Sequence, residues 1–289
     1  MRILVIGSGF LATPIVHRLE SEGHEILIYT RTSSERIRSL QIQGDIFDFE
    51  QFVKVFIWKP QIIIHTAWVT APGLYRDDLT NLKYAEFTAK LAKLIAHSDV
   101  EHLIILGTCA EYGLQRGPST AGITKLSPST LYAEQKVVAF NEVRKLLQDS
   151  KVRFTWARVF YPYGLNQNQK RLIPYIIYAL KNGEPVVLAD TTSIHDWITT
   201  RDIASAVLWA IENDVPMEID IGTTFAYTNL ELLVTLERLL LMTNRDPQHG
   251  VHNFGLNEMS VVGKNSALFT SGWRPMDSLN TGLEWILGS

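Results

Sequence analysis

The chain has 289 residues, of which 46% are hydrophobic and 20% charged, and its net charge is −3. These values are typical of a globular protein with one large or two small domains, and they do not favour a nucleic acid or a membrane as its partner. The single cysteine, Cys109, excludes an internal disulfide or a multi-cysteine metal site, and we expect a protein of the cytoplasm. The apolar run Met1–Ile6 is too short for a signal peptide.

The first motif is a glycine turn between a strand and a helix. The run Ile3–Ile6 predicts a buried parallel strand, and Gly7-Ser8-Gly9-Phe10-Leu11-Ala12 follows it. In a dinucleotide-binding turn the first glycine allows the tight turn and the second lets the backbone approach a pyrophosphate. We therefore expect cofactor phosphates against Gly7, Gly9, Phe10 and Leu11, with an ordinary strand-to-helix turn as the alternative.

The end of the second predicted strand, Glu25–Tyr29, bears on the choice of nucleotide. NAD-selective sites usually place an acid here for the ribose, whereas an arginine accommodates the 2′-phosphate of NADP. The sequence continues Thr30-Arg31-Thr32-Ser33-Ser34, without an acid. We expect Arg31 and the neighbouring hydroxyls to favour NADP(H), with NAD(H) still possible; otherwise Arg31 is a solvated surface residue.

Further strands are expected to end on the same rim of a sheet. Asp45 and Ile46 end a strand-like segment and are expected at the cofactor, with Asp45 at the adenine. Thr66 and Ala67 end the buried strand Ile62–Ala67, whose carboxyl end is expected against the cofactor. Thr108 follows the run Leu103–Leu106. Strand–helix units that repeat about every 30 residues predict an α/β fold with a doubly wound, Rossmann-type parallel sheet.

Tyr132 and Lys136 are spaced to lie on one face of a helix. A lysine cation beside a phenol favours the phenolate, so we expect Lys136 to lower the pKa of Tyr132 and make it a proton donor or acceptor. A pair with this spacing also arises by chance, so its position relative to the other motifs carries the weight. The histidines show no metal-ligand spacing, and we expect no metal.

These motifs together resemble the extended short-chain dehydrogenase/reductases, in the NAD(P)-dependent epimerase/dehydratase family that acts on nucleotide sugars. The resemblance runs nearly end to end. The motifs that carry it are the glycine turn, Asp45-Ile46, His65-Thr66-Ala67, Asn81, Thr108–Gly113, Pro128, Tyr132, Lys136, Arg158, Tyr161–Gly164, Arg171–Pro174, His195–Asp202 and Gly272–Pro275.

The resemblance implies roles for several residues. It makes Thr108 the hydroxyl that binds the sugar oxygen, Tyr132 the acid/base and Lys136 the partner of the nicotinamide ribose. Tyr161 is implied to line the nicotinamide amide, unless it belongs to a plain aromatic loop. The residues expected at the substrate are Cys109, Asn168, Arg171 and His195.

Three departures from the family pattern bear on the reaction. The glycine turn is one residue shorter than usual, and His195 stands where an arginine often contacts the substrate diphosphate, so that Lys170 or Arg171 is an alternative source of charge. Cys109-Ala110 replaces the Asp-Glu pair of the 4,6-dehydratases, which argues against a dehydratase. Cys109 itself is read either as a catalytic thiol or, in preference, as a small buried residue behind the site.

The resemblance also implies two lobes. Residues 1–164, with a return at about 196–222, are expected to form the cofactor domain, and about 165–195 with 223–289 a smaller C-terminal substrate-binding lobe. Helices 81–96 and 132–147 often form the dimer interface in the family, so we expect a homodimer. The further elements expected are strands Phe154–Val159 and Glu218–Ile221 and helices Ile173–Leu180, Ala204–Ile211 and Leu230–Met242.

Arg31 and the missing dehydratase acids favour an NADPH-dependent reductase, and the resemblance implies a nucleotide-activated keto sugar, expected to be a 4-keto-6-deoxyhexose, as its substrate. An epimerase that keeps NAD tightly bound uses the same three residues, Thr108, Tyr132 and Lys136, and is the main alternative. A non-catalytic NADP-sensing protein is the third; such proteins commonly lose the tyrosine or the lysine, and both are present here.

Overall fold

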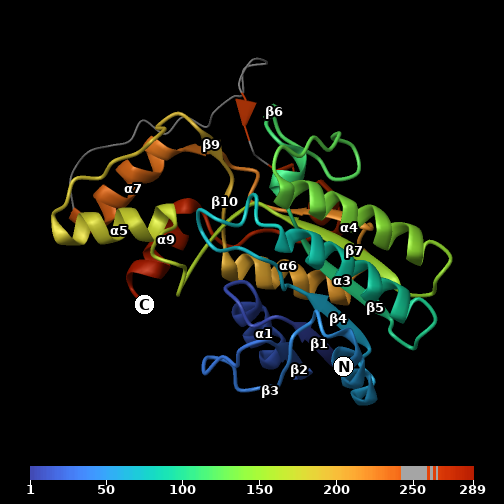
Figure 1. Ribbon diagram of the computed structural model, residues 1–289. Helices are drawn as coiled ribbons and strands as arrows, with labels where there is room; N and C mark the ends of the chain where they lie inside the picture. Colours follow the sequence, from blue (N-terminus) through green and yellow to red (C-terminus); the bar gives the residue numbers. More distant parts are fainter. Residues whose placement is uncertain (242–258, 261–262, 265) are drawn as a thin grey trace.

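A parallel sheet forms the centre of the molecule (Figure 1). The computed structural model describes residues 1–241, 259–260, 263–264 and 266–289. In this part of the chain the central sheet has seven strands, all parallel. Their spatial order is β11 (Glu218–Ile221), β7 (Arg153–Val159), β5 (His102–Thr108), β4 (Ile62–His65), β1 (Arg2–Ile6), β2 (Glu25–Thr30) and β3 (Leu40–Gln43). The predicted doubly wound Rossmann-type fold is confirmed.

The strand order reverses direction between β1 and β4. From β1 the chain builds outward through β2 to β3, then crosses back to β4 and builds the other way through β5 and β7 to β11. In open parallel sheets ligands bind beyond the carboxyl ends of the strands at such a switch point. The glycine turn after β1 and the residues after β4 therefore lie where a nucleotide is expected.

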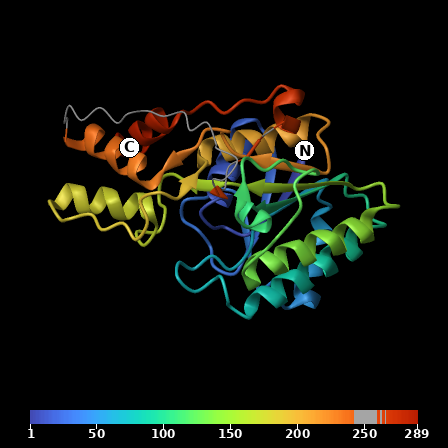
Figure 2. The same cartoon turned by 90° about the horizontal axis from the view of Figure 1, so that it is seen from above.

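Helices cover both faces of the sheet, which is why the inner strands read as continuous apolar runs. One face carries α1 (Ala12–Ser21), α6 (Thr200–Glu212) and α8 (Ser266–Ser271). The other carries α2 (Phe49–Phe52), η1 (Val53–Trp58), α3 (Thr80–Ile95) and α4 (Leu131–Leu147). Figure 2 shows the orange α6 and the green α4 on opposite sides of the sheet.

A second group of helices packs beside the carboxyl edge of the sheet. It contains α5 (Leu172–Asn182), α7 (Asn229–Leu241) and α9 (Leu279–Leu287), joined through a separate apolar cluster (Figure 1). The remaining elements are η2 (Cys109–Tyr112) and the short pairs β8 (Tyr161–Tyr163) with β10 (Trp197–Thr199), β9 (Ile194–His195) with β12 (Tyr227–Thr228), and β6 (Gln115–Arg116) with β13 (Met259–Ser260).

The C-terminal part of the chain does not all join this group. Leu268 of α8 and Trp273 are buried in the apolar cluster that contains α1, α6 and β11. The predicted smaller lobe includes all of 223–289, and the burial of Leu268 and Trp273 in the other cluster differs from that prediction. The division of the chain into two lobes stays a prediction. Met242, the expected end of the helix that begins near Leu230, lies outside the described residues.

Candidate active site

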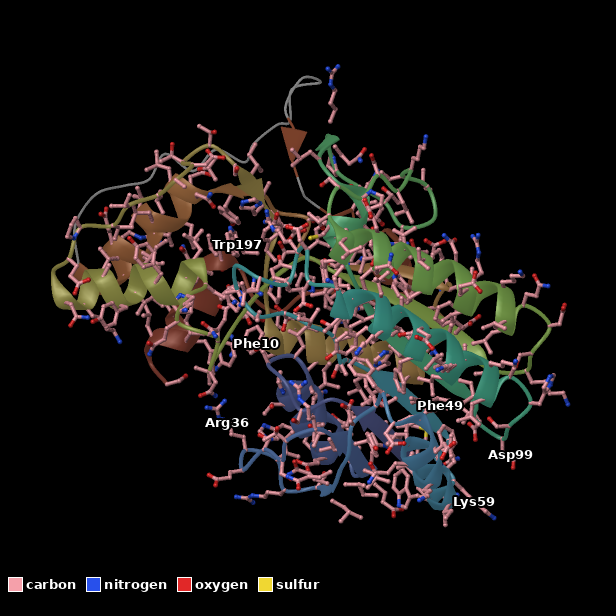
Figure 3. All side chains as sticks on the ribbon, viewed as in Figure 1. Phe10, Arg36, Phe49, Lys59, Asp99 and Trp197 are labelled. Carbon is pink, nitrogen blue, oxygen red and sulfur yellow. The ribbon has the colours of Figure 1, made fainter. Side chains whose placement is uncertain are left out.

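A cavity of about 910 Å³ opens at the carboxyl ends of the central strands. Its lining includes residues from both groups of helices, such as Ala12 of α1 and Leu172 of α5. Figure 3 labels two other lining residues, Phe10 on the glycine turn and Trp197 on β10. Of the residues predicted for the site, those that line it are Gly7, Gly9, Phe10, Leu11, Arg31, Asp45, Ile46, Thr66, Ala67, Thr108, Cys109, Tyr132, Tyr161, Asn168, Arg171 and His195. The remaining predicted residue, Lys136, is buried and does not line the cavity.

The glycine turn has the features of a phosphate-binding cradle. Gly7 has φ +107°, and a Cβ there would lie 2.7 Å from Thr66 Oγ1, so this position requires glycine. A Cβ on Gly9 would meet no protein atom within 4 Å, which leaves its backbone open to the cavity. No side chain caps the first turn of α1. Thr13 N donates to the Gly9 carbonyl at 3.2 Å, and the other N–H groups of the first turn can face an anion, so the turn fits a pyrophosphate.

The end of β2 differs in part from the prediction. Thr30 and Arg31 line the cavity, but Thr32, Ser33 and Ser34 do not. The Thr30 hydroxyl already bonds to Ser8 Oγ at 2.7 Å and donates to the Thr32 carbonyl at 3.0 Å. The predicted group of several hydroxyls beside Arg31 is thus not found in the lining, and the exposed Arg31 is the cation at this end.

Tyr132 reaches the far end of the cavity from the first turn of α4. The Thr130 hydroxyl caps this helix by accepting a hydrogen bond from Ala133 N at 3.3 Å, and Tyr132 N donates to the Arg76 carbonyl at 2.9 Å. Burial raises the pKa of Tyr132, while a hydrogen bond with the Thr108 side chain acts in the opposite direction. The structure thus joins the predicted acid/base to the predicted hydroxyl.

Lys136 does not lower the pKa of Tyr132 in the way the sequence predicted. Lys136 is 4% exposed, and its ammonium donates to the Leu106 carbonyl at 2.7 Å, with Nζ 3.8 Å from the centre of the Trp68 ring. Burial lowers the pKa of Lys136 to about 7, with Glu111 acting in the opposite direction. Desolvation of the phenol therefore dominates over the lysine charge.

A buried ionic network supports the segment that carries Thr108. Glu111 accepts a hydrogen bond from Thr108 N at 2.8 Å and from Arg158 Nε at 2.6 Å, and both charged side chains are fully buried. The Trp156 indole donates to both Glu111 oxygens at 3.1 and 3.0 Å. Arg158 Nη1 also contacts the carboxylate of Glu218 at 2.7 Å, and the Glu218 side chain is mostly buried. Because the carboxylate of Glu111 fixes the Thr108 backbone directly, the network sets the position of the Thr108 hydroxyl.

Cys109 lines the cavity but lacks the environment of a reactive thiol. Burial raises its pKa, and the carboxyl groups of Asp196, Glu111 and Asp220 raise it further. Reactive thiols need nearby positive charge to form the thiolate, so the structure favours the interpretation as a small buried residue.

Alkylation tests the state of this thiol, because Cys109 is the only cysteine in the sequence. We expect native protein at pH 8 to react with iodoacetamide at least about a hundredfold more slowly than free cysteine, since the raised pKa leaves little thiolate. The urea-unfolded chain is the control and is expected to react at the rate of the free amino acid. Rapid labelling of native protein would restore the catalytic-thiol interpretation.

The substrate side of the cavity is aromatic and carries little charge. The His195 and Tyr161 rings lie 4.0 Å apart between centroids, and burial lowers the pKa of His195 to about 4. His195 is therefore neutral near pH 7 and does not replace an arginine at a diphosphate. Arg171 lines the cavity and donates to the Thr70 carbonyl at 2.9 Å, whereas Lys170 does not line it. Arg171 and Arg76 are thus the cations that line the cavity at this end.

Sequence reasoning missed several residues of the wall. Trp68 follows the predicted Ala67 and could have been inferred from its place just after a buried strand. Tyr75 and Arg76 come from the loop between β4 and α3, whose path no pattern in the sequence determines. The Tyr75 ring meets the edge of the Tyr132 ring with centroids 4.9 Å apart. The role of Glu111 was hidden because its partner Arg158 is distant in sequence.

Two further structural findings concern the described residues only. Among them, no cluster of three or more histidine, cysteine, aspartate or glutamate side chains could hold a metal ion. None of their helices is both long and apolar enough to cross a membrane.

The Rossmann-type sheet and the glycine turn at the cavity define the class of dinucleotide-binding folds. A model of the NAD dependent epimerase/dehydratase family matches residues 3–222, and the chain belongs to this family. The expected class, an NAD(P)-dependent oxidoreductase-type enzyme, is confirmed at this level.

Individual relatives are distant but cover the whole chain. The chain is 23% identical to a UDP-glucose 4-epimerase of Mycolicibacterium smegmatis over 98% of its own length and 96% of the relative's. A dTDP-glucose 4,6-dehydratase of Bacillus anthracis in complex with NAD has a TM-score of 0.82 at 22% identity, covering 100% of this chain and 96% of that one. A UDP-glucose 4-epimerase of Thermotoga maritima with UDP-glucose has a TM-score of 0.80 at 19% identity, covering 100% of this chain and 98% of that one. At these identities the structural likeness shows the fold.

Proposed function

We propose that the protein is an NADPH-dependent reductase of a nucleotide-activated keto sugar, with a 4-keto-6-deoxyhexose as the expected substrate. The observation that carries the proposal is the joining of Tyr132 and Thr108 at the end of the cavity, with Cys109 and Ala110 in the positions where a dehydratase has acids. The keto-sugar substrate rests on the family resemblance.

In this proposal the protein supplies position and a proton, and the bound nicotinamide supplies the hydride. The Thr108 hydroxyl orients the carbonyl oxygen of the sugar, and Tyr132 donates its proton to that oxygen as negative charge develops on it. The raised pKa of Tyr132 keeps the phenol protonated, which suits reduction, where a proton must be given. Lys136 is the candidate partner of the nicotinamide ribose and compensates the phenolate left behind.

The nucleotide-sugar substrate would lie against the second group of helices. Arg171 is the candidate for its diphosphate, and the rings of Tyr161, His195 and Trp197 offer apolar faces. Asn168 and Cys109 complete the wall. A UDP-glucose molecule is bound in the Thermotoga maritima epimerase named above, and we propose a ligand of the same chemical class here.

An epimerase that retains NAD is the second candidate. It uses the same tyrosine, threonine and lysine, and the relatives and neighbours named above include epimerases and an NAD complex. The two functions differ in what leaves the enzyme: a reductase consumes one NADPH for each sugar, whereas an epimerase regenerates its cofactor. A non-catalytic NADP sensor is less well supported, because Tyr132 and Lys136 are both present.

The test between the two is to measure the cofactor content of the purified protein and then its reaction with nucleotide-4-keto-6-deoxyhexoses and nucleotide hexoses. A reductase is expected to lose its cofactor on purification and to oxidise NADPH in proportion to the keto sugar supplied. Retained NAD, with interconversion of hexose epimers and no net oxidation, would move the assignment to the epimerase.

The preference for NADP(H) is tested at Arg31. We expect Arg31→Ala to weaken NADPH binding roughly tenfold or more, because a charge-assisted contact with the 2′-phosphate is lost, and to leave NADH binding nearly unchanged. Fluorescence titration with both cofactors measures this, and Arg36→Ala, which alters an arginine outside the cavity lining, is the matched control. Equal losses for both cofactors would contradict the 2′-phosphate interpretation.

We also propose a homodimer through α3 and α4, and a cytoplasmic location. Both follow from the family resemblance, and the solution mass measured by light scattering tests the first. A monomeric mass at micromolar concentration would contradict it.

A further inference from the structure

The Lys136 ammonium has an unusual set of neighbours for a buried charge. Within the described residues no carboxylate oxygen lies close enough to form an ion pair with it. Its Nζ atom donates to the Leu106 carbonyl at 2.7 Å and lies 3.8 Å from the centre of the Trp68 ring. The Trp156 ring is farther away, at 5.8 Å. One carbonyl and one indole face therefore contact the ammonium directly. Two buried titratable groups also interact with it electrostatically: against the effect of burial, Glu111 raises the pKa of Lys136, and the Lys136 charge adds to burial in lowering the pKa of His65.

An indole face suits this position for a physical reason. A cation is attracted to the negative face of an aromatic ring, and tryptophan gives the strongest such contact. The ring does not accept a directional hydrogen bond as a carboxylate would, so it holds the ammonium without using up its donors. With one of its three N–H groups on Leu106, Lys136 keeps donors free for a ligand hydroxyl.

Trp68 is itself held firmly. Its Nε1 donates to Asn81 Oδ1 at 2.7 Å, and Asn81 Nδ2 donates in turn to the carbonyls of Tyr75 at 2.7 Å and Asp78 at 2.8 Å. The indole stacks on Tyr84 with the centroids 5.4 Å apart. Both Trp68 and Asn81 are buried. The orientation of the Trp68 ring is therefore fixed. Its Nε1 edge bonds to Asn81 of α3, its ring stacks on Tyr84 of α3, and Asn81 is itself bonded to the loop before α3.

The indole also adjoins the predicted acid/base. The Trp68 ring meets the Tyr132 ring edge-on, with centroids 6.5 Å apart, and it lines the cavity. Trp68 thus stands between the cavity, Lys136 and Tyr132. Loss of its aromatic face would leave the buried ammonium with the Leu106 carbonyl, the more distant Trp156 ring and the charge of Glu111.

We propose that Trp68 is a positioning residue whose indole face holds the Lys136 ammonium beside the Leu106 carbonyl, oriented toward the ribose of the nicotinamide cofactor. The inference rests on the proposed function for one point, the role of Lys136 at that ribose. It assigns to Trp68 no contact with the reacting atoms.

The first experiment measures cofactor affinity against pH in Trp68→Leu, Trp68→Phe, Lys136→Met and wild-type protein, by the fluorescence of added NADPH and NADH. We expect Trp68→Leu to bind both cofactors roughly tenfold more weakly, the size of one desolvated cation–π contact, and Trp68→Phe to recover part of the loss. The indole stabilises the cation, so its removal lowers the pKa of Lys136 further. The decline in affinity at high pH should therefore begin about one pH unit lower in Trp68→Leu.

A matched control separates positioning from general damage to the fold. Trp209 is a half-buried tryptophan of α6 that bonds to Ser271 and does not line the cavity. We expect Trp209→Leu to lower the melting temperature while leaving the cofactor affinity and its pH profile unchanged. If Trp68→Leu and Trp68→Phe lose affinity equally, with the wild-type pH profile, the aromatic face has no positioning role.

A second experiment does not depend on the stability of a variant. Fluorinated tryptophans supplied during growth replace all seven tryptophans and weaken the ring's attraction for a cation with little change in shape. We expect cofactor affinity to fall stepwise with the number of fluorine atoms in the wild type and to change much less in Trp68→Phe, where only the more distant Trp156 ring remains near the ammonium. Affinity independent of fluorination in the wild type would overturn the inference.

The outcomes also separate this inference from the proposed function. If Lys136→Met binds both cofactors as well as the wild type at every pH, the role of Lys136 at the cofactor fails. If Lys136→Met loses affinity and Trp68→Leu does not, the proposed function stands and the role of Trp68 is wrong.

Discussion

Replacement of Tyr132 by phenylalanine is expected to lower turnover at least about a hundredfold, since positioned acid/base help is typically worth that much. The change removes only the hydroxyl. The ring contacts with Tyr75 and Trp68 and the backbone bond to Arg76 are retained. We therefore expect cofactor affinity and melting temperature to stay close to the wild-type values, so that the loss falls on turnover.

Steady-state kinetics with the keto sugar that the wild type reduces, together with cofactor titration, measures this split. Tyr178→Phe makes the same chemical change on the exposed side of α5, outside the cavity lining, and serves as the control. Near-normal turnover in Tyr132→Phe would remove Tyr132 from the mechanism.

Replacement of Glu111 by alanine is expected to lower the free energy of unfolding by about 3–5 kcal/mol, the usual result of removing one partner of a buried ion pair. Arg158 would then keep a fully buried charge whose remaining carboxylate partner is Glu218. The Trp156 indole and the backbone N–H of Thr108 would also lose their acceptor. Urea unfolding followed by circular dichroism measures the change.

Glu218→Ala is the matched control, because it removes the other carboxylate that Arg158 contacts. The Glu218 side chain is 18% exposed, so water can replace part of the contact, and we expect a distinctly smaller loss of stability than for Glu111. Equal and small losses in the two variants would mean that the buried pair does not hold the segment of Thr108.

The sheet could be predicted from the sequence because its strands are buried on both faces. Runs such as Ile62–Ile64 and Ile104–Leu106 have no polar residue, and parallel strands covered by helices read in this way. The rim residues followed from the same argument, since parallel strands end at one edge. Thr66, Thr108 and Asp45 all line the cavity for this reason.

What the sequence could not predict depends on contacts between distant segments. The spacing of Tyr132 and Lys136 predicted that they lie on one face of a helix, but it could not predict how deeply α4 packs against the sheet. That depth buries Lys136 against Leu106 and Trp68 and raises the pKa of Tyr132 instead of lowering it. Similarly, Thr32, Ser33 and Ser34 follow Arg31 directly in the sequence, but they do not line the cavity.

Hydride transfer from deuterium-labelled NADPH to a nucleotide-4-keto-6-deoxyhexose tests the account most directly. The reaction is followed by mass spectrometry of the sugar and by oxidation of the cofactor, with wild-type protein and Tyr132→Phe side by side. The account predicts one deuterium in each sugar product, one cofactor oxidised with it, and at least about a hundredfold slower transfer in Tyr132→Phe. Binding of the cofactor and the nucleotide sugar without any transfer of deuterium would contradict the assignment as a reductase.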